Sequence, residues 1–473
     1  MKKKVAIYPG FGTSTHEPLH QKLIDFAGAV GYSYESLNNF EKNNFLERAK
    51  VNVAVWFSFL ILNIYKKDRD LVKYKGIKIF HSLIEYSIRM HPLGKFIFNS
   101  RETLDLIAKS INYIRCCTRF FKQNNVVLII GGDEAYIHGS ILGQLAVQKN
   151  IKHLYIKQFN PYIAGFHFDT KTLYAGPNFK TYPDFYSTLH LDPEIINQYR
   201  NEIRDAANGR PNYFFMRNQD TPIPDLTKVE KDFLDDAVVL FLHDFIDSPG
   251  IYGSCVFFDQ WEWIAESVTI LKRYNKRLVI KIHPNVNDSN KVAIQLLKQL
   301  YHDDKSILFI EKKTSLIVLK ENGIRGVLTL FGSVIVECAF LGIPCISAAN
   351  NPYIGFEISL NAISKNDFRK KMANLCGGKI QQEPGELKMK SVRAFISHRM
   401  FYAANYLVKN LPYDDVDKDL FQEMYAEIPG TVNYGINERR SVFLNSGKLR
   451  EYVIEKINCE EADLKERFYF LIN

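Results

Sequence analysis

The stretch Arg325–Ala348 reads Arg-Gly-Val-Leu-Thr-Leu-Phe-Gly-Ser-Val-Ile-Val-Glu-Cys-Ala-Phe-Leu-Gly-Ile-Pro-Cys-Ile-Ser-Ala. Its pattern predicts a strand, a Gly-Ser turn, a short helix, a Gly-Pro break and a second strand. The start of such a helix can bind an anion, because its first backbone N–H groups are unpaired and the helix dipole favours negative charge. Glu337 lies four residues after Ser333 and therefore on the same helix face. The pair suits a phosphate beside Ser333 and a ribose hydroxyl beside Glu337, although a capping serine and a solvated glutamate would give the same pattern.

The flanking residues extend this pattern into one α/β domain. Strands are expected at residues 237–242, 277–282, 306–310, 326–330 and 344–347, and helices at residues 259–274, 289–301, 315–322 and 333–341. Strands that alternate with helices over short connections predict a doubly wound parallel sheet. Ligands bind such a sheet beyond the carboxyl ends of its strands. This rule selects the loops at residues 243–244, 283–285, 311–313 and 331–333.

A second motif, Lys281-Ile282-His283-Pro284-Asn285, ends one of these strands. Lys281 and His283 alternate with the isoleucine, so their side chains share one face of the strand. His283 precedes Glu337 by 54 residues (337 − 283), which is enough for two strand–helix units and places both on the same edge of the sheet. A lysine, a histidine and a helix start could together hold a pyrophosphate or a phosphodiester.

Polar residues follow two further strands. His243 and Asp244 come after the strand at 237–242 and are expected at the same edge, although the Asp-Ser-Pro sequence after them could simply cap the next helix. In the first half of the chain, Asp133 and Glu134 follow a buried strand beside a glycine pair. A carboxylate there could deprotonate an acceptor hydroxyl or attack a sugar carbon. A capping acid at the start of the following helix is the alternative.

The first half also predicts an α/β domain. Strands are expected at residues 3–8, 126–130 and 152–156, and helices after the Gly-rich loop 10–16 and at residues 100–122 and 140–149. Residues 157–230 show weak periodicity and are interpreted as irregular, substrate-facing segments. We expect an acceptor-side domain at residues 1–232, a donor-binding domain at 233–400, and a helical tail at 401–473 that packs back on the first domain.

Composition and missing motifs exclude several classes of function. The chain has 473 residues, 46% of them hydrophobic and 24% charged, which is typical of a globular protein. The net charge of +9 (61 Lys and Arg minus 52 Asp and Glu) suits an anionic ligand or membrane surface, but no nucleic-acid-binding motif is present. Zinc-protease, P-loop and serine-hydrolase motifs are absent, and we expect no metal site. Seven cysteines without metal-binding spacing favour a reduced, cytoplasmic protein.

The longest apolar run, at residues 51–65, is too short to span a bilayer. A buried helix is the first interpretation of this run. An interfacial segment is the second, because Lys66, Lys67 and Arg69 follow and would suit an anionic lipid surface. At the start of the chain, the apolar run after three lysines is too short for a signal peptide, so we expect none.

The motifs within residues 237–356 resemble those of the bacterial capsule polysaccharide biosynthesis glycosyltransferases, a group that includes Kdo transferases. The resemblance rests on Lys-Ile-His-Pro and on the Gly-Ser turn that is followed by a glutamate and by Gly-Ile-Pro. It implies a GT-B arrangement, in which two Rossmann-like α/β domains face a central cleft and the second binds the nucleotide-sugar donor. It also implies that His283, Ser333 and Glu337 bind this donor. The chain departs from the pattern at Phe331-Gly332, where a small hydroxyl residue is common, and at Cys338, where alanine is common.

The resemblance predicts a glycosyltransferase that moves a sugar from a CMP- or UDP-linked donor to a glycan or glycolipid acceptor of a capsule or lipopolysaccharide. It would need no metal or other cofactor and would work in the cytoplasm, in peripheral contact with the inner membrane. The donor site would comprise His243, Lys281, His283, Pro284, Asn285, Gly332, Ser333 and Glu337, and the catalytic carboxylate would be Asp133 or Glu134. The alternatives are a CDP-glycerol glycerophosphotransferase, a sugar-nucleotide epimerase, and an inactive saccharide-binding protein on the same scaffold.

Overall fold

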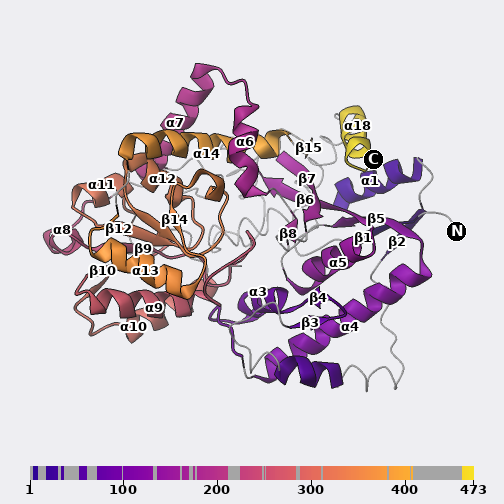
Figure 1. Cartoon of the computed structure of the whole chain (residues 1–473), viewed down its shortest axis with the longest axis horizontal. Helices are drawn as coiled ribbons and strands as arrows, with labels where there is room; N and C mark the ends of the chain where they lie inside the picture. Colours follow the sequence, from indigo (N-terminus) through magenta and orange to yellow (C-terminus); the bar gives the residue numbers. More distant parts are fainter. Residues whose placement is uncertain are drawn as a thin grey trace, which may run out of the picture. The chain divides into compact units, whose positions relative to one another are not determined.

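The chain folds into two compact units, each built from separate stretches of sequence (Figure 1). The computed structural model describes residues 4–8, 17–29, 33–36, 53–60, 72–98, 100–131, 136–159, 162–169, 174–175, 178–210, 224–247, 250, 252–283, 288–310, 313–380, 383–404, 406–408 and 461–472. Unit 1 contains Met1–Ser87, Ile97–Pro177 and Tyr402–Asn473, and unit 2 contains Ile88–Phe96 and Asn178–Phe401. The boundary at residue 178 precedes the expected boundary at 232, because the helix Pro193–Ala207 packs against a helix of unit 2.

Unit 1 is built around a mixed sheet. Its strands are β1 (Lys4–Tyr8), β2 (Ser33–Ser36), β5 (Val126–Gly131), β6 (Lys152–Phe159), β7 (Tyr162–Asp169), β8 (Tyr174–Ala175) and β15 (Tyr406–Val408). Their order is β15-β7-β6-β5-β1-β2, with β8 paired to β7. The strands β2, β1, β5 and β6 run parallel, whereas β7 is antiparallel to β6, β8 and β15.

The helices of unit 1 are α1 (Glu17–Ala29), α3 (Phe80–Met90, whose last turn belongs to unit 2), α4 (Arg101–Gln123), α5 (Ile137–Gln148) and α18 (Glu461–Ile472), and a small hairpin joins β3 (Lys73–Tyr74) to β4 (Ile77–Lys78). The helix α4 forms because Ser100 caps it, accepting a hydrogen bond from the Thr103 amide at 3.1 Å, and because a buried isoleucine stripe follows. At the other end of the chain, α18 packs against α1, where the rings of Phe26 and Phe468 lie 6.3 Å apart.

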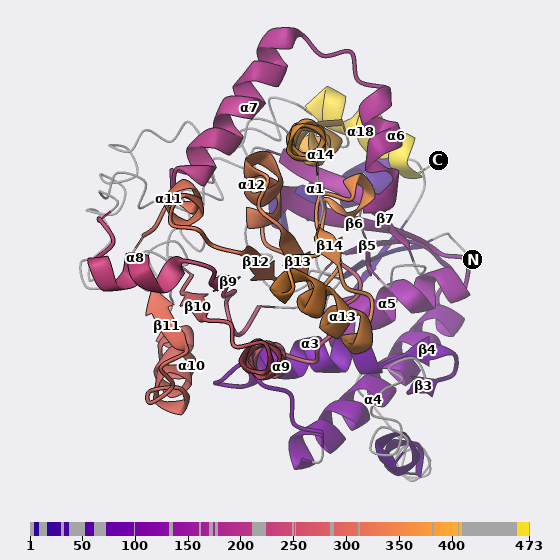
Figure 2. The same cartoon turned by 60° about the vertical axis from the view of Figure 1, so that its left-hand side comes forward.

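Unit 2 contains a fully parallel sheet in the order β11-β10-β9-β12-β13-β14 (Figure 2). The strands are β9 (Val238–Phe241), β10 (Leu278–Lys281), β11 (Ile307–Ile310), β12 (Gly326–Thr329), β13 (Cys345–Ser347) and β14 (Leu360–Asn361). The first five lie where the apolar runs of the sequence predict them. The chain starts at β9, moves outward through β10 and β11, and then returns to the other side of β9 for β12, β13 and β14.

Helices cover both faces of this sheet. They are α6 (Tyr182–Ser187), α7 (Pro193–Ala207), α8 (Lys228–Leu234), α9 (Gln260–Arg273), α10 (Asp288–Leu300), α11 (Leu316–Glu321), α12 (Val334–Leu341), α13 (Lys365–Cys376) and α14 (Pro384–Ala404, whose last turn belongs to unit 1), with short 3-10 turns at Phe179–Thr181 and Ile354–Phe356. Alternating strand residues feed two cores: Val239 and Val327 pack with α12 and α14, whereas Leu240 and Leu328 pack with α9 and α13.

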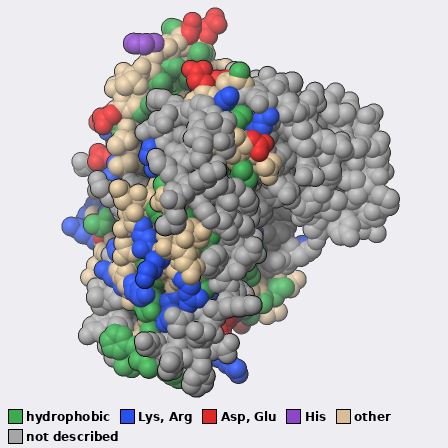
Figure 3. All heavy atoms as spheres, turned by 90° about the vertical axis from the view of Figure 1, so that its right-hand side faces the viewer, with side chains coloured by type: hydrophobic (Ala, Val, Ile, Leu, Met, Phe, Trp, Pro, Cys, Tyr) green, Lys and Arg blue, Asp and Glu red, His purple; other side chains and the backbone are tan. Residues whose placement is uncertain are grey.

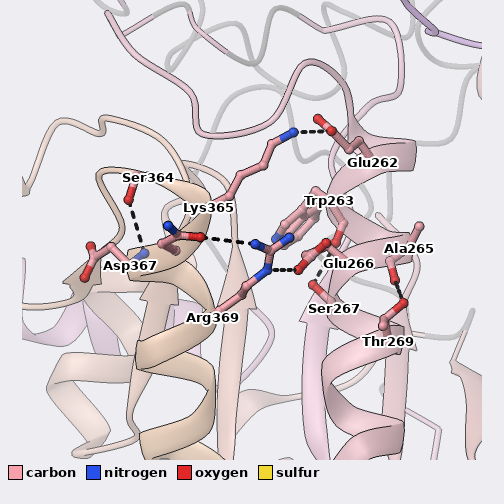
Figure 4. A network of polar contacts seen from close by, with 11 residues as sticks. Glu262, Trp263, Ala265, Glu266, Ser267, Thr269, Ser364, Lys365, Asp367 and Arg369 are labelled. Carbon is pink, nitrogen blue, oxygen red and sulfur yellow. Dashed lines mark hydrogen bonds and ion pairs between the residues drawn. The ribbon is translucent and has the colours of Figure 1, made fainter. Parts of the chain in front are cut away.

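A polar network ties α9 to α13 at their exposed edge (Figure 4). Lys365 pairs with Glu262, and Arg369 pairs with Glu266 while also donating to Asn366 at 3.1 Å. Beneath these ion pairs the buried ring of Phe368 packs against other apolar residues of that core. The two helices are therefore joined by an apolar contact with charged residues around it.

Two sequence expectations are corrected by the structure. Residues 53–60 form a helix, but most of its large apolar side chains are exposed, so the first interpretation as a buried helix is wrong for them. Residues 157–230 were expected to be irregular, yet they include β7 and the fifteen-residue helix α7. The helix was hidden because its buried face is small, comprising Ile203, Ala206 and Ala207. Among the described residues, no helix is long and apolar enough to cross a bilayer.

Candidate functional site

The candidate site lies at the carboxyl edge of the unit 2 sheet, between β9 and β12. The strand order places β9 in the middle, with the chain leaving it toward β10 on one side and returning beside it at β12. Ligands of such sheets bind in the crevice where this direction changes. His243 follows β9, His283 follows β10 and Ser333 follows β12, so the topology brings the ends of these three motifs to one edge.

His243 is fixed at this edge by a chain of hydrogen bonds. Its Nε2 lies 2.9 Å from the hydroxyl of Thr329, the last residue of β12, and accepts the amide of Leu330 at 3.3 Å. The Thr329 hydroxyl oxygen in turn accepts the amide of Gly332 at 3.2 Å. The loop after β9 and the loop before α12 are therefore joined through one buried threonine.

This arrangement defines the tautomer of His243. Because Nε2 accepts the Leu330 amide and faces the Thr329 hydroxyl proton, the ring proton must lie on Nδ1. Burial, together with a smaller contribution from the nearby His283, lowers the pKa of His243 to about 3. At neutral pH the ring is therefore uncharged. It can donate a hydrogen bond from Nδ1 to a ligand, but it supplies no positive charge.

The start of α12 offers backbone donors to an anion. Ser333 precedes the helix, and its side chain makes no capping hydrogen bond. The carbonyls of Gly332 and Ser333 already accept the amides of Ile335 and Val336, at 3.2 Å and 2.9 Å. Within the described part of the chain, the amides of Ser333 and Val334 have no acceptor. The helix start is therefore open, which differs from the alternative of a serine-capped helix.

Gly332 holds this turn close to the histidine. A Cβ at this position would lie 3.0 Å from the Thr329 hydroxyl and 3.2 Å from Cε1 of His243. Both distances are tighter than ordinary van der Waals contact, so a larger residue would push the turn away from His243. The glycine therefore lets the open amides of α12 and the imidazole share one small region.

Glu337 lies one turn further along α12, on the same face as Ser333. It is half-buried, and no hydrogen bond or ion pair from the described residues reaches its carboxyl group. Burial raises the pKa of Glu337 to about 7. Near neutral pH this carboxyl can therefore both accept and donate hydrogen bonds to hydroxyl groups. A perturbed carboxyl beside an open helix start is typical of a functional site.

Lys281 lies beneath this edge and not at its surface. Its side chain is buried, and Nζ donates to the Ile282 carbonyl at 3.1 Å. Burial lowers its pKa to about 8, so the ammonium form still predominates at pH 7. The lysine can therefore contribute a positive field from below the edge, while His283 beside it is partly exposed. Pro284 and Asn285 lie outside the described residues.

Aromatic rings line the edge next to Gly332, a feature that sequence reasoning missed. The ring of Phe331 lies 4.4 Å from that of His243 and 5.6 Å from that of Tyr252. The ring of Tyr252 in turn lies 5.5 Å from that of Phe179. In the sequence Phe331 stands out only as a departure from the family pattern, and nothing joins it to Tyr252 and Phe179, which lie 79 and 152 positions earlier (331 − 252 and 331 − 179).

In unit 1, the expected catalytic residues Asp133 and Glu134 lie outside the described residues. The structure describes what flanks them: β5 ends at Gly131, and Tyr136 precedes α5 with φ 59° and ψ 175°. This backbone region is normally reserved for glycine, so the turn is strained. Beside it the rings of His138 and Tyr113 lie 4.8 Å apart, and burial lowers the pKa of His138 to about 4.

Within the described ranges, no group of three or more His, Cys, Asp or Glu side chains could hold a metal ion. The groups that converge on the edge in unit 2 are instead backbone amides, a neutral imidazole and a half-buried carboxyl. This set is suited to the phosphate and hydroxyl groups of an organic ligand.

Comparisons with known proteins give limited similarity. No protein-family model matches the chain, and no curated protein matches it. The β-Kdo 2,4 transferase KpsC of Thermosulfurimonas dismutans is 12% identical with a TM-score of 0.34, over 59% of this chain and 85% of that one. Its β-Kdo 2,7 transferase counterpart is 10% identical with a TM-score of 0.30, over 62% and 81%. The UDP-GlcNAc 2-epimerase of Methanocaldococcus jannaschii, in complex with UDP-GlcNAc and UDP, is 12% identical with a TM-score of 0.28, over 85% and 100%. Because these scores are low, the function has to be argued from the site itself.

Proposed function

We propose that the protein is a nucleotide-sugar-dependent glycosyltransferase that binds its donor at the β9–β12 edge of unit 2. One observation carries the proposal: the open amides of Ser333 and Val334, with the half-buried Glu337 one turn along the same helix face. Amides at a helix start suit a phosphate. A carboxyl about one helical turn away suits the hydroxyl pair of a ribose.

The chemistry follows from the charges at this edge. Transfer of a sugar leaves a nucleotide whose phosphate gains negative charge as the glycosidic bond breaks. The helix start and the Lys281 ammonium would stabilise that charge without a metal ion, and the neutral His243 would donate from Nδ1. The acceptor hydroxyl would belong to a glycan or glycolipid, and Asp133 or Glu134 would take up its proton.

The test of the donor site compares two changes at one position. Ser333 has φ −57°, which proline can adopt, so Ser333→Pro removes the amide and the hydroxyl, whereas Ser333→Ala removes the hydroxyl alone. Nucleotide affinity is measured by thermal shift with CMP, UDP, CDP and GDP, since a ligand that binds the native state raises its stability. We expect Ser333→Pro to weaken binding about 10- to 100-fold, the loss of one charge-assisted hydrogen bond. Ser333→Ala should bind within a few-fold of the native chain. Equal binding by both would reject the helix start as the phosphate site.

Turnover assays separate the transferase from its alternatives. A transferase consumes its sugar donor in the presence of an acceptor and hydrolyses it slowly without one. A sugar-nucleotide epimerase converts its donor with no acceptor present, and a glycerophosphotransferase uses CDP-glycerol. Nucleotide binding without any turnover over this panel would leave a saccharide-binding protein and overturn the enzymatic part of the proposal.

A further inference from the structure

Residues 53–60 form a helix in unit 1 that turns an apolar face outward. Val53, Trp56, Phe57 and Leu60 expose 72%, 61%, 64% and 55% of their surface. Their spacing of three, four and seven residues puts them on one side of the helix. Val55 and Ser58 on the opposite side are only 5% and 4% exposed, so this side packs into the unit. Large apolar side chains grouped in solvent indicate an interaction surface.

A rigid basic hairpin lies at the same end of unit 1. In Figures 1 and 2 the helix is the dark indigo one at the lower end of both views, and the β3–β4 hairpin lies above it in the lower half. Residues 72–79 contain three lysines and no acidic residue. The side chains of Lys73 and Lys75 are exposed. Figure 3 shows Lys and Arg side chains next to hydrophobic ones at this end of the molecule.

Hydrogen bonds to α5 hold the hairpin in place. Gln144 donates to the Lys78 carbonyl and accepts the Lys78 amide, both at 3.0 Å. Gln148 donates to the Lys75 carbonyl at 2.9 Å. The positive charges of the hairpin are therefore presented by a fixed backbone and not by a loose loop.

We propose that this end of unit 1 docks onto an anionic membrane surface, with the 53–60 helix lying in the interface. Two features of the surface select this partner. The eight helix residues carry no charge, and their outward face has a tryptophan and a phenylalanine, which favour the boundary between lipid headgroups and acyl chains. The neighbouring lysines complement the negative charge of the lipid headgroups. The inference is independent of the donor site and holds for any chemistry in unit 2.

The test uses the full chain and vesicles of phosphatidylglycerol and phosphatidylethanolamine. We expect co-sedimentation with these vesicles, weaker binding at high salt, and little binding to pure phosphatidylcholine. The fluorescence of Trp56 reports how deeply the 53–60 helix enters the lipid layer. This fluorescence should shift to the blue on binding and be quenched by lipids brominated in the acyl chain, and both changes should disappear in Trp56→Phe while binding persists.

Variants test the two parts of the surface separately. Trp56→Gln with Phe57→Gln should weaken vesicle binding at least about tenfold, because it removes two interfacial side chains. Lys73→Gln with Lys75→Asn should weaken it about 25-fold, at roughly fivefold for each of the two charges. Asparagine is chosen at position 75 because the backbone there has φ 52°. Circular dichroism and thermal melting confirm that each variant is folded.

A matched pair of valine substitutions tests whether vesicle binding depends on the outward face of the 53–60 helix or on exposed apolar surface in general. Val53→Gln on the helix and Val229→Gln on α8 remove the same side chain at nearly equal exposure, 72% and 74%. Only Val53→Gln should weaken vesicle binding. No vesicle binding by the native chain, or equal binding by the Trp56→Gln, Phe57→Gln variant, would overturn the proposal. The proposal would also be overturned if vesicles do not bind and the chain instead self-associates, or captures another protein, in a way that depends on Trp56.

Discussion

Glu337 is the residue whose chemistry separates a structural helix from a binding site. Its carboxyl is half-buried on α12, and no ion pair from the described residues reaches it. Burial raises the pKa of this carboxyl to about 7. Between the unfolded pKa of 4.5 and the folded value, the native state holds more protons than the unfolded state. Stability therefore falls as pH rises through this range. A group that reduces stability at its working pH is expected where function requires it.

Glu337→Gln removes this penalty. We expect the variant to be more stable than the native chain at pH 8.5, by about 1 kcal/mol after allowance for its partial exposure, and by much less at pH 5. Urea unfolding at both pH values measures the difference. Glu386→Gln is the control, because Lys390 lowers the pKa of Glu386 and its loss should not stabilise the chain at high pH. Equal stabilisation at pH 5 and 8.5 would contradict the role of the charge.

His243 should give a pH dependence of the opposite sign. Its folded pKa of about 3 lies below the unfolded value of 6.5, so the unfolded state binds more protons between these values. Stability is therefore lost as pH falls below 6.5. In His243→Gln, an amide oxygen can accept the Thr329 and Leu330 hydrogen bonds without titrating. The variant should lose less stability than the native chain between pH 7 and pH 5, as read from urea midpoints. An unchanged slope would show that other groups control this range.

At the scale of elements, the region where α9 and α13 meet shows which side chains hold these two helices on the unit 2 sheet. Phe368 of α13 is fully buried and packs edge-on against Phe257, which lies just before α9, with ring centroids 5.1 Å apart. Its neighbour Arg369 forms an ion pair at the surface with Glu266. Phe368→Ala should lower the free energy of unfolding by about 3–5 kcal/mol, whereas Arg369→Ala should lower it by less than about 1 kcal/mol. Chemical unfolding of both variants tests this, and similar losses would contradict the assignment of stability to the apolar contact.

The elements of unit 2 were largely predictable, and those of unit 1 less so, for a physical reason. Strands β9, β10, β12 and β13 are short apolar runs that are buried almost throughout, and the edge strand β11 is an apolar run that is partly buried, so their composition identifies them directly. The apolar composition of residues 53–60 predicted a helix but could not say which face would be buried. The antiparallel β7 lies in a segment whose sequence showed no clear alternation.

In the candidate site, too, the sequence reveals features that are local and not those that depend on contacts between distant residues. The Gly-Ser turn and Glu337 could be found from sequence because they lie within a few residues of each other. The hydrogen bond from Thr329 to His243 could not, since it joins positions 86 residues apart and the threonine belongs to an otherwise apolar strand. Burial of Lys281 also depends on helices that pack over β10, and these are set by tertiary structure.

At the scale of the whole molecule, the described chain enters unit 2 twice. The short segment Ile88–Phe96 belongs to unit 2 although the residues on both sides of it belong to unit 1. Trp261 donates to the Leu93 carbonyl at 2.7 Å, and the Phe96 amide donates to the buried Asp259 at 3.0 Å. These bonds satisfy polar groups that would otherwise be left without partners near the core, so the segment is part of the folding unit.

Gly94 is the point at which this dependence can be tested. Its φ is +57°, and a Cβ would lie 1.9 Å from the Phe245 carbonyl oxygen, so Gly94→Ala combines backbone strain with a clash. We expect a loss of about 3 kcal/mol or more. Gly385→Ala is the matched control, because nothing lies within 4 Å of its Cβ and it is in helix α14; it should stabilise by up to about 1 kcal/mol.

Tryptophan fluorescence assigns the effect to the correct unit. Trp261 and Trp263 both belong to unit 2, whereas Trp56 of unit 1 is 61% exposed and should respond less to unfolding. If Ile88–Phe96 is part of the fold of unit 2, Gly94→Ala shifts the fluorescence-detected transition to lower urea concentration. A variant whose circular dichroism changes while this transition stays at the native midpoint would show that the segment belongs, in folding, with the unit 1 helices on either side of it.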